Sequence, residues 1–363
     1  NDAERIAKIH LKKMPNFKGL LYDSIISTTD DDHWRSQRKS FIGAFDPFSS
    51  LEKILPISDG RARKCSDILI GLSNGGKKEV NINDFFLNET QAQLQLALFG
   101  LSNEFQEETN SKIRDAFSGD GQIGYARDFA FKLIDELENS NGPLSQAIKE
   151  RGKVEIEEAY GNALIFAFAG HDTTGHTLTW LIYELSKNMK LQLELQKEVD
   201  NFWLEQGSKK IKLDDFKRLK FMTRCIMEIL RLWPAVPNGT FRELVFDDEI
   251  MGLNDQKVQL KKGTFVQILN WSRHRNKELW GRDADTFNPN RQFEENEIWD
   301  DQGFAGFNPG TKRFSPFTYP PRDCLGKNFA QIEMRLILLH LLKKFSFILT
   351  DNQAKHVSNN EEK

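Results

Sequence analysis

Cysteine is scarce in this sequence, because Cys65, Cys225 and Cys324 are the only three in 363 residues. Their odd number, without a CxxC pair, argues against a disulfide framework and against a cysteine zinc site. Long apolar runs are also missing, since residues 163–169 and 336–339 fall far short of the roughly 18 residues that indicate a membrane span. Neither sign of charge dominates, because the formal net charge is −3. We therefore expect no nucleic-acid partner.

Helical periodicity dominates what is present and predicts a mainly α fold. We expect helices over about 32–45, 51–72, 84–100, 104–117, 125–138, 155–187, 190–205, 215–232 and 325–343. Gly and Asn predict loops at 73–78 and 139–143, and we expect the polar tail 358–363 to be disordered. From about 240 to 320, strand-like pieces alternate with turns, which predicts small β-sheets and a loop-rich segment before Cys324.

One predicted helix contains the stretch GNALIFAFAGHDTTGHTLTW, residues 161–180. Its seven consecutive apolar residues indicate a helix that is buried on all sides. Asp172 and Thr173 interrupt this pattern, and a buried carboxylate needs partners or a function. Ala169 and Gly170 are small and leave space beside the helix. One interpretation is a packing notch with a threonine bonded to its own helix, and the other is a functional polar pair.

Two further pairs of side chains have helical spacing. Glu228 and Arg231 are three residues apart on a helix that Pro234 ends, and their apolar neighbours predict partial burial. A buried pair needs a further partner for the guanidinium. Trp34 and Arg38 are four residues apart and form either a simple stacking pair or part of the cradle of a large acidic cofactor.

Cys324 stands immediately before a predicted helix and two residues after Arg322. This place is the positive end of the helix dipole, which favours the thiolate over the thiol. A thiolate with no second thiolate nearby is a single metal ligand, and haem iron takes such an axial cysteine. Arg322 would then pair with a haem propionate. The alternative is a cysteine that serves only as a small buried hydrophobe.

Four separated motifs resemble, in order, those of the cytochrome P450 haem-thiolate monooxygenases. The family's Trp-x-x-x-Arg is matched by Trp34 and Arg38. Its central-helix motif, Ala/Gly-Gly-x-Asp/Glu-Thr-Thr/Ser, is matched by Ala169, Gly170, Asp172, Thr173 and Thr174. Its Glu-x-x-Arg, completed by the Arg of a Pro-x-Arg segment, is matched by Glu228, Arg231 and Arg291. Its cysteine loop, Phe-x-x-Gly-x-Arg-x-Cys-x-Gly, is matched by Phe317, Arg322, Cys324 and Gly326.

The resemblance assigns a role to each of these residues. It implies that Cys324 ligates the iron of haem b and that Asp172 and Thr173 relay protons as catalytic residues. The residues that it places around the cofactor, several of them on the propionates, are Trp34, Arg38, Ala169, Gly170, Arg242, Phe317, Arg322 and Gly326. It makes Glu228, Arg231 and Arg291 a structural triad. The substrate pocket that it implies is lined by Ile165, Phe166, Ala169, Val236 and Asn238.

The implied activity is insertion of one oxygen atom of O2 into an apolar small molecule. Electrons would come from NADPH through the partner NADPH-cytochrome P450 reductase, which we expect to dock on a basic face at Arg35, Lys39, Arg61, Arg63 and Lys64. The motifs look like those of eukaryotic microsomal members, which implies a monomer on the cytosolic face of the endoplasmic reticulum membrane. Membrane contact would use parts that lie outside this chain.

The resemblance covers about 19–348 and implies that residues 1–363 form one P450 catalytic domain. We expect the N-terminal anchor, the first sheet and the C-terminal hairpin to be missing, so that the chain is truncated at both ends. Pro320 replaces the usual glycine of the cysteine loop, and proline cannot hold a positive φ. The alternatives are a haem-thiolate peroxide isomerase or dehydratase and a non-catalytic truncated remnant.

Overall fold

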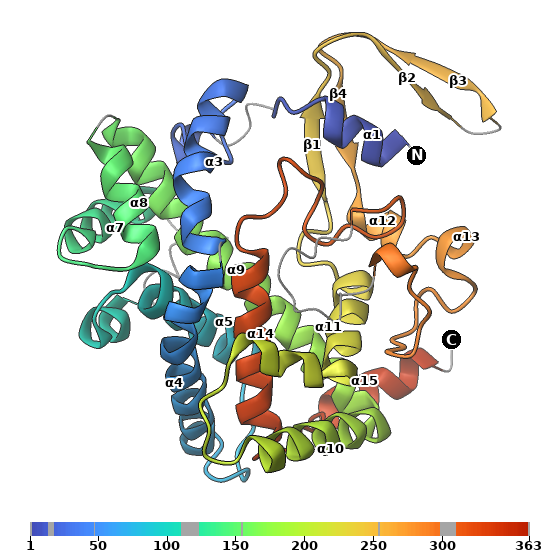
Figure 1. Ribbon diagram of the computed structural model, residues 1–363. Coiled ribbons are helices and arrows are strands. Elements are labelled where there is room, and N and C mark those ends of the chain that lie inside the picture. The colour runs from blue at the N-terminus through green and yellow to red at the C-terminus, as the bar shows by residue number, and fades with distance from the viewer. Residues whose placement is uncertain are drawn as a thin grey trace.

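The computed structural model describes residues 2–13, 18–46, 48–109, 123–153, 155–252, 255–297 and 310–361. Helices make up most of these residues, and the strands form only two short sheets (Figure 1). The prediction of a mainly α fold with small sheets and a loop-rich segment before Cys324 is confirmed. Among the described residues, no helix combines the length and the apolar character that crossing a bilayer requires.

The elements follow one another in three groups along the chain. The first group is α1 (Asp2–Ile9), α2 (Lys18–Leu21), α3 (Asp31–Phe45), α4 (Phe48–Leu72), α5 (Ile82–Gln93), the π-helix η1 (Leu94–Phe99), α7 (Ile123–Leu137) and α8 (Pro143–Gly152). The second is α9 (Ile156–Lys187), α10 (Met189–Gln206), the 3₁₀ helix η2 (Leu213–Arg218) and α11 (Lys220–Leu232). The third is β1 (Thr240–Glu243), β2 (Asp248–Met251), β3 (Lys257–Leu260), β4 (Phe265–Ile268), α12 (Asn270–His274), α13 (Lys277–Trp280), η4 (Glu295–Glu297), α14 (Lys327–Leu342) and α15 (Asp351–Glu361).

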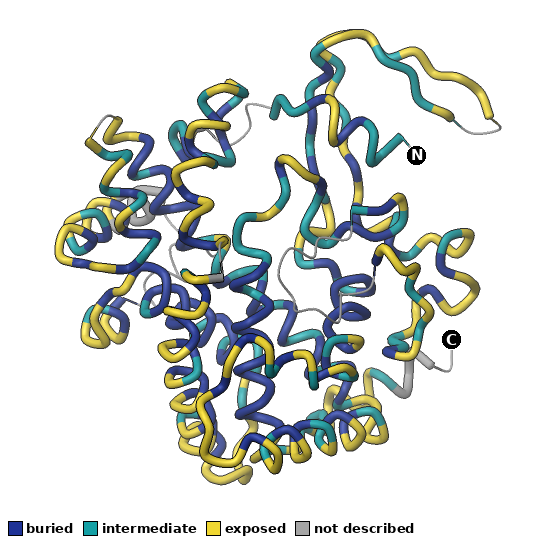
Figure 2. The backbone as a smooth tube through the Cα atoms, viewed as in Figure 1, coloured by how far each residue is buried: buried dark blue, intermediate teal, exposed yellow. Residues whose placement is uncertain are grey.

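The long helix α9 lies at the centre of the helical part, with α5, α7, α8 and α14 packed around it (Figure 1). Residues 161–167 of α9 are buried, and so are most residues of α14, although α14 also contains polar and charged side chains (Figure 2). Burial of apolar surface is the dominant favourable term in folding, so these helices supply much of the stability. The core is therefore a bundle built around the residues that the sequence marked as a buried helix.

The N-terminal helix α1 packs against the strands rather than against the bundle (Figure 1). Strands β1 and β4 pair antiparallel, and so do β2 and β3. The Arg5 guanidinium donates to both carboxylate oxygens of Asp248 at 2.7 Å, and the Glu243 N–H donates to the Lys12 carbonyl at 2.9 Å. These contacts hold the beginning of the chain beside β1.

Several elements differ from the sequence predictions. The loop expected at 139–143 is shorter by one residue, because α8 begins at Pro143. Proline is favourable at the first position of a helix, where a backbone N–H would have no partner within the helix. The disorder expected for the tail is wrong up to residue 361, since α15 extends through Glu361. A helix was predicted at 104–117, and its residues 104–109 are helical, while the remainder lies outside the described residues.

Candidate functional site

Cys324 lies in the loop that leads into α14, and this loop rises between α3 and the β1–β4 sheet (Figure 1). The residue is accessible at its surface. The protein packed around it nevertheless raises the pKa of the Cys324 thiol by desolvation, while the Gly326 N–H and the Lys327 charge act in the opposite direction. A side chain at Gly326 would begin 4.0 Å from the Cys324 sulfur and 3.8 Å from Phe45. The sulfur therefore keeps a free approach and a backbone donor.

The other two cysteines are unsuitable as ligands. Cys65 and Cys225 are fully buried in the core, and burial raises the pKa of each thiol well above its usual value. A thiolate is the form that binds metals. Cys324 is thus the cysteine that the fold leaves open to a ligand.

A cluster of buried cations lies beside this loop. Trp34 of α3 packs its ring under the Arg322 guanidinium, whose central carbon is 4.3 Å from the ring centroid. Arg322 Nη2 donates to Asp31 at 3.0 Å, but Nε and Nη1 have no hydrogen-bond partner among the described residues. Burial lowers the pKa of Arg322 to about 10. Donors held this way indicate a place for an anion.

Arg242 extends the same cluster from β1. It is fully buried and donates to the Thr240 hydroxyl and the Phe241 carbonyl, while its Nη2 has no partner among the described residues. Desolvation, followed by the nearby Arg322 charge, lowers the pKa of Arg242 to about 10. Lys13 lies next to both guanidinium groups, which help to lower its pKa. Lys13 is absent from the sequence-based assignment, because its position carries no motif.

Arg38 borders this cluster, because its guanidinium carbon lies 5.9 Å from the centroid of the Trp34 ring and its charge helps to lower the pKa of Arg322. Its two terminal nitrogens donate to the carbonyl and the carboxylate of Asp323 at 2.8 and 2.5 Å. Lys327 lies 3.2 Å from the second oxygen of the same carboxylate. Arg38 therefore fastens the cysteine loop to α3 through Asp323, one residue before Cys324, and its assignment to a propionate stays a prediction.

These observations fit a cysteine-ligated haem. The unpartnered N–H groups of Arg242 and Arg322 are donors for the two propionates, and Cys324 is the accessible thiol for the iron. The Cys324 N–H donates to the Phe317 carbonyl at 3.0 Å, which closes the loop on itself. Pro320 does not prevent this turn, because the residue with positive φ in the loop is Thr318.

Helix α9 approaches the cysteine loop through aromatic residues. Phe166 lies 5.7 Å from Phe45, measured between ring centroids, and Phe45 is the ring that faces Gly326. Ala169 is exposed, although the residues before it on the helix are buried, so the helix surface is open at this point. The Thr173 hydroxyl, one turn further along, donates to the Ala169 carbonyl at 3.0 Å. The surface of α9 is therefore accessible at Ala169 and Thr173, and this accessible surface is termed the opening.

Gly170 follows Ala169 on α9 and packs against η1, and its assignment to the cofactor stays a prediction. A Cβ atom at Gly170 would lie 2.7 Å from Leu94 of η1. Gly170 therefore allows close packing of α9 against η1, and the space beside it is already filled.

Asp172 is also not buried as expected. Its side chain is 33% exposed, and its Oδ1 lies 3.5 Å from Nδ1 of His176. The expectation rested on the apolar run before it, but Asp172 comes after the run, where the helix surface is more accessible. The desolvation argument for a functional carboxylate therefore fails, whereas the proton relay stays a prediction.

The expected substrate-pocket residues fall into two groups. Ile165 and Phe166 are buried on α9, next to the opening at Ala169. Val236 and Asn238 are exposed in the turn after α11, and their carbonyls accept hydrogen bonds from the Asn270 and Gln267 side chains. These bonds fix the backbone of the turn and leave its side chains open.

The structure brings Glu228, Arg231 and Arg291 together. Arg231 and Glu228 form a bidentate pair at 2.7 and 2.8 Å, with both side chains 0% exposed, and Arg291 Nε donates to Glu228 at 3.1 Å. Arg231 also donates to the carbonyls of three residues in the loop-rich segment, His274, Ala284 and Thr286. The three nitrogens of the Arg231 guanidinium, which burial shields from water, therefore all donate to acceptors in the protein. The three charges thus fasten the loop-rich segment to α11.

The basic face expected for the redox partner needs one correction. Arg61 is buried and pairs with the buried Glu89 at 2.7 Å, so it is not part of a surface. Arg35 and Lys39 are exposed on α3, and Arg35 pairs with Asp32. Arg63 and Lys64 are paired with Asp59 and Glu107.

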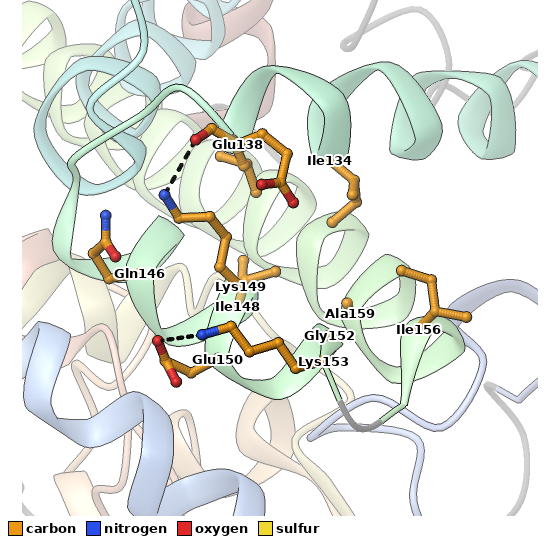
Figure 3. Close-up of a pocket in the computed structure, with 11 residues that line it drawn as sticks. Ile134, Glu138, Gln146, Ile148, Lys149, Glu150, Gly152, Lys153, Ile156 and Ala159 are labelled. Atoms are coloured by element: carbon orange, nitrogen blue, oxygen red, sulfur yellow. Dashed lines mark hydrogen bonds and ion pairs between the residues drawn. The ribbon is translucent and has the colours of Figure 1, made fainter.

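A surface cavity of about 450 Å³ lies elsewhere, between α7, α8 and the start of α9 (Figure 3). Its apolar floor includes Ile134 and Ile148. The two lysines on its rim already have acceptors, Lys149 at the Glu138 carbonyl and Lys153 at the Glu150 carboxylate. None of the predicted site residues lines this cavity, and it presents no group with an evident chemical task.

The open cysteine, the buried arginines with unpartnered N–H groups and the central helix define an α-helical protein suited to a cysteine-ligated haem. The sequence comparison identifies the family: the cytochrome P450 model matches residues 80–362, and the chain belongs to the cytochrome P450 family. Cytochrome P450 CYP13A5 of Caenorhabditis elegans is 28% identical over 262 residues, which cover 69% of this chain and 47% of that protein. Cytochrome P450 714C3 of Oryza sativa subsp. japonica is 25% identical over 374 residues, which cover 93% of this chain and 69% of that protein.

A third relative, cytochrome P450 CYP13A3 of Caenorhabditis elegans, is 29% identical over 276 residues, which cover 73% of this chain and 50% of that protein. The chain therefore spans about half the length of the worm relatives that it matches. Membership of the family implies a haem iron cofactor and oxidoreductase chemistry in general.

Proposed function

We propose that this chain is the haem-binding catalytic part of a monooxygenase that inserts one atom of O2 into an apolar organic substrate. The observation that carries the proposal is the combination of an accessible Cys324 with two buried arginines, Arg242 and Arg322, some of whose N–H groups lack an acceptor among the described residues. A core cysteine would need no such neighbours. A purely structural arginine cluster would be expected to satisfy its own donors.

In this proposal, each residue of the candidate site has a role that follows from its position. Cys324 holds the iron, and the haem supplies the oxygen activation when it is bound. The Gly326 N–H stabilises negative charge on the sulfur, which the surrounding protein otherwise disfavours. Phe166 and Phe45 exclude water from one side of the site. The opening at Ala169 admits an apolar substrate, and the Thr173 hydroxyl is the group there that can hold or pass a proton.

The source of electrons is part of the same proposal. Arg35 and Lys39 offer an exposed basic patch on α3, which is the helix that holds Trp34 against Arg322. Opposite charges steer association, so an acidic patch on NADPH-cytochrome P450 reductase would dock here. The monomeric state, the endoplasmic reticulum membrane and the identity of the substrate stay predictions.

The test is the spectrum of the reduced protein with carbon monoxide. We expect a thiolate-type red-shifted Soret band that Cys324→Ser abolishes. Cys65→Ser and Cys225→Ser place a hydroxyl in the core and lower stability, but they leave the position of the band unchanged. A wild-type protein that takes up no haem would overturn the proposal. Loss of the band in Cys225→Ser alone would show that Cys225, and not Cys324, is the iron ligand.

A second candidate is a haem-thiolate peroxide isomerase, which needs no proton relay. The observation that favours it is the bond of the Thr173 hydroxyl to its own helix, together with the exposure of Asp172. Turnover of a lipid hydroperoxide without NADPH or O2 would support this candidate. For the monooxygenase we expect Thr173→Ala to divert NADPH electrons into hydrogen peroxide while haem content stays constant.

A further inference from the structure

Three tryptophans from different elements lie against one another: Trp180 of α9, Trp233 at the end of α11 and Trp271 of α12. The rings of Trp180 and Trp233 are parallel within 2°, and their centroids are 3.8 Å apart. The Trp271 ring follows at 5.9 Å from the Trp233 ring. Neutral aromatic rings prefer offset or edge-to-face contacts, with centroids roughly 4.5–7 Å apart, to a parallel pair at a shorter distance. Packing alone therefore does not explain this tryptophan stack.

The tryptophan stack leads from the neighbourhood of the opening on α9 to the protein surface. Thr173 and Trp180 are seven residues apart on α9, which is close to two turns, so they share one face and lie about 10 Å apart along the helix. At the other end of the stack, Trp271 is 42% exposed. The stack therefore begins two helix turns from the opening and ends in solvent.

The middle ring of the stack has a proton acceptor. Trp233 Nε1 donates to Glu184 at 2.9 Å, and the Glu184 side chain is 7% exposed. The central carbon of the Arg275 guanidinium lies 4.7 Å from the centroid of the Trp233 ring. A positive charge on this indole is unfavourable so close to a guanidinium. Loss of an electron from Trp233 is therefore coupled to transfer of its N–H proton to Glu184, which leaves a neutral radical.

We propose that the tryptophan stack carries electrons from the surface to the haem site, so that the protein reduces hydrogen peroxide with a small water-soluble reductant of the ascorbate class. The inference rests on the proposed haem function and adds a second activity to it. Reduction of one hydrogen peroxide to two molecules of water takes up two electrons and two protons. Oxidation of one ascorbic acid to dehydroascorbic acid releases two electrons and two protons.

The residues of the stack pass these electrons one at a time. Ascorbate gives an electron to the exposed Trp271, and Trp233 and Trp180 pass it toward the opening. Glu184 takes the N–H proton when Trp233 is oxidised and returns it when the next electron arrives. The stack therefore ends each cycle in its original state.

The first measurement uses the full chain loaded with haem, with hydrogen peroxide and ascorbate and without an organic substrate. We expect Trp233→Phe to slow the oxidation of ascorbate several-fold and to speed the bleaching of haem, because phenylalanine is much harder to oxidise than tryptophan. Trp271→Phe has the same effects without a change in the core, since Trp271 is exposed. Trp203→Phe is the matched control, because the partly buried Trp203 donates to the Leu339 carbonyl and lies outside the stack.

The second measurement tests the proton transfer in the full chain without haem. Photoexcited ruthenium tris-bipyridine with persulfate removes one electron from the protein, and transient absorption distinguishes the neutral tryptophan radical from its cation. We expect the neutral radical in wild type and a longer-lived cation in Glu184→Gln, whose amide oxygen accepts the hydrogen bond but not the proton. Trp203→Phe leaves the wild-type spectrum unchanged.

Oxidation of ascorbate at the wild-type rate in Trp233→Phe and Trp271→Phe, with haem bound, overturns the inference and leaves the proposed function intact. An equal loss in Trp203→Phe shows that any tryptophan serves and also overturns it. Identical radical spectra of wild type and Glu184→Gln overturn the coupling to Glu184 and, with it, the inference. A wild-type protein that takes up no haem overturns the inference together with the proposed function.

Discussion

Trp34 and Arg322 lie face to face, with the guanidinium carbon 4.3 Å from the centroid of the indole ring, although they come from opposite ends of the chain. The ring covers one side of a guanidinium group whose one carboxylate partner among the described residues is Asp31. A planar cation on an aromatic face gains attraction without using its N–H donors. Trp34 therefore orients Arg322 and leaves its other donors available.

Replacement of this indole should weaken the cofactor site. We expect Trp34→Leu to lower haem affinity several-fold, because a partly desolvated cation–π contact contributes about 1–2 kcal/mol. Trp271→Leu is the matched control, since Arg275 stacks on Trp271 at 3.7 Å outside the cysteine loop. Titration of each protein with haem provides the measurement. Equal losses in both variants would show that indole stacking has no specific part in the site.

The buried triad should govern stability. Glu228→Ala leaves the guanidinium groups of Arg231 and Arg291 buried without their carboxylate, so we expect the free energy of unfolding to fall by about 3–5 kcal/mol. Asp32→Ala breaks a pair of the same spacing that is exposed, and it should change stability little. Urea unfolding of the haem-free proteins gives both values. Similar losses in the two variants would mean that burial of the triad does not matter.

Stability should also depend on pH through Glu333 of α14. Desolvation, followed by repulsion from Glu89, raises the pKa of Glu333 well above 4.5, whereas Thr174 lowers it. The folded protein therefore keeps the Glu333 proton at pH values where the unfolded chain has released it. Stability falls as the pH rises from 4.5 to the raised pKa, by about 1.4 kcal/mol per pH unit.

Glu333→Gln should flatten this dependence, because an amide does not titrate. Glu205→Gln is the control, since the Glu205 side chain is exposed. Urea unfolding across this pH range measures the slope. An unchanged slope in Glu333→Gln would place the proton on another group.

Close packing at Gly170 should be sensitive to a single methyl group. We expect Gly170→Ala to destabilise the protein by about 1–3 kcal/mol, because the new Cβ would lie 2.7 Å from Leu94. Gly60→Ala on α4 meets no atom within 4 Å and should instead stabilise its helix. In a double-mutant cycle, Leu94→Ala should remove most of the penalty at Gly170. Additive effects would show that the two residues do not compete for space.

Local motifs revealed the fold class and much of the site. Helical spacing predicted the contact of Glu228 with Arg231, and the position before a helix singled out Cys324. The sequence could not place Lys13, whose neighbours lie more than 200 residues away and which carries no motif of its own. The same reasoning failed for Gly170, since the absence of a side chain does not tell whether a cavity or a neighbouring helix fills the space.

The partners of charged side chains were the least predictable feature, because several groups of opposite charge can compete for the same side chain. Arg38 was expected to meet an acidic cofactor, but the sequence did not reveal that Asp323 also accepts a hydrogen bond from it. Arg61 was expected on the surface, but it is buried and forms an ion pair with the buried Glu89. Sequence spacing fixes which residues share a helix face. It does not determine which of several possible partners from distant segments forms the ion pair with a given residue.

Between β4 and the cysteine loop, the described residues form only the short helices α12, α13 and η4, yet Arg231 binds the backbone of this part at His274, Ala284 and Thr286. One side chain thus replaces the ladder of hydrogen bonds that a sheet would provide. The amide hydrogens around these anchor points should exchange with solvent together, in one cooperative opening with α11, and more slowly than amides in ordinary loops. The stretches between the anchors carry no such constraint, so this segment can change its length there while its attachment to the core stays the same.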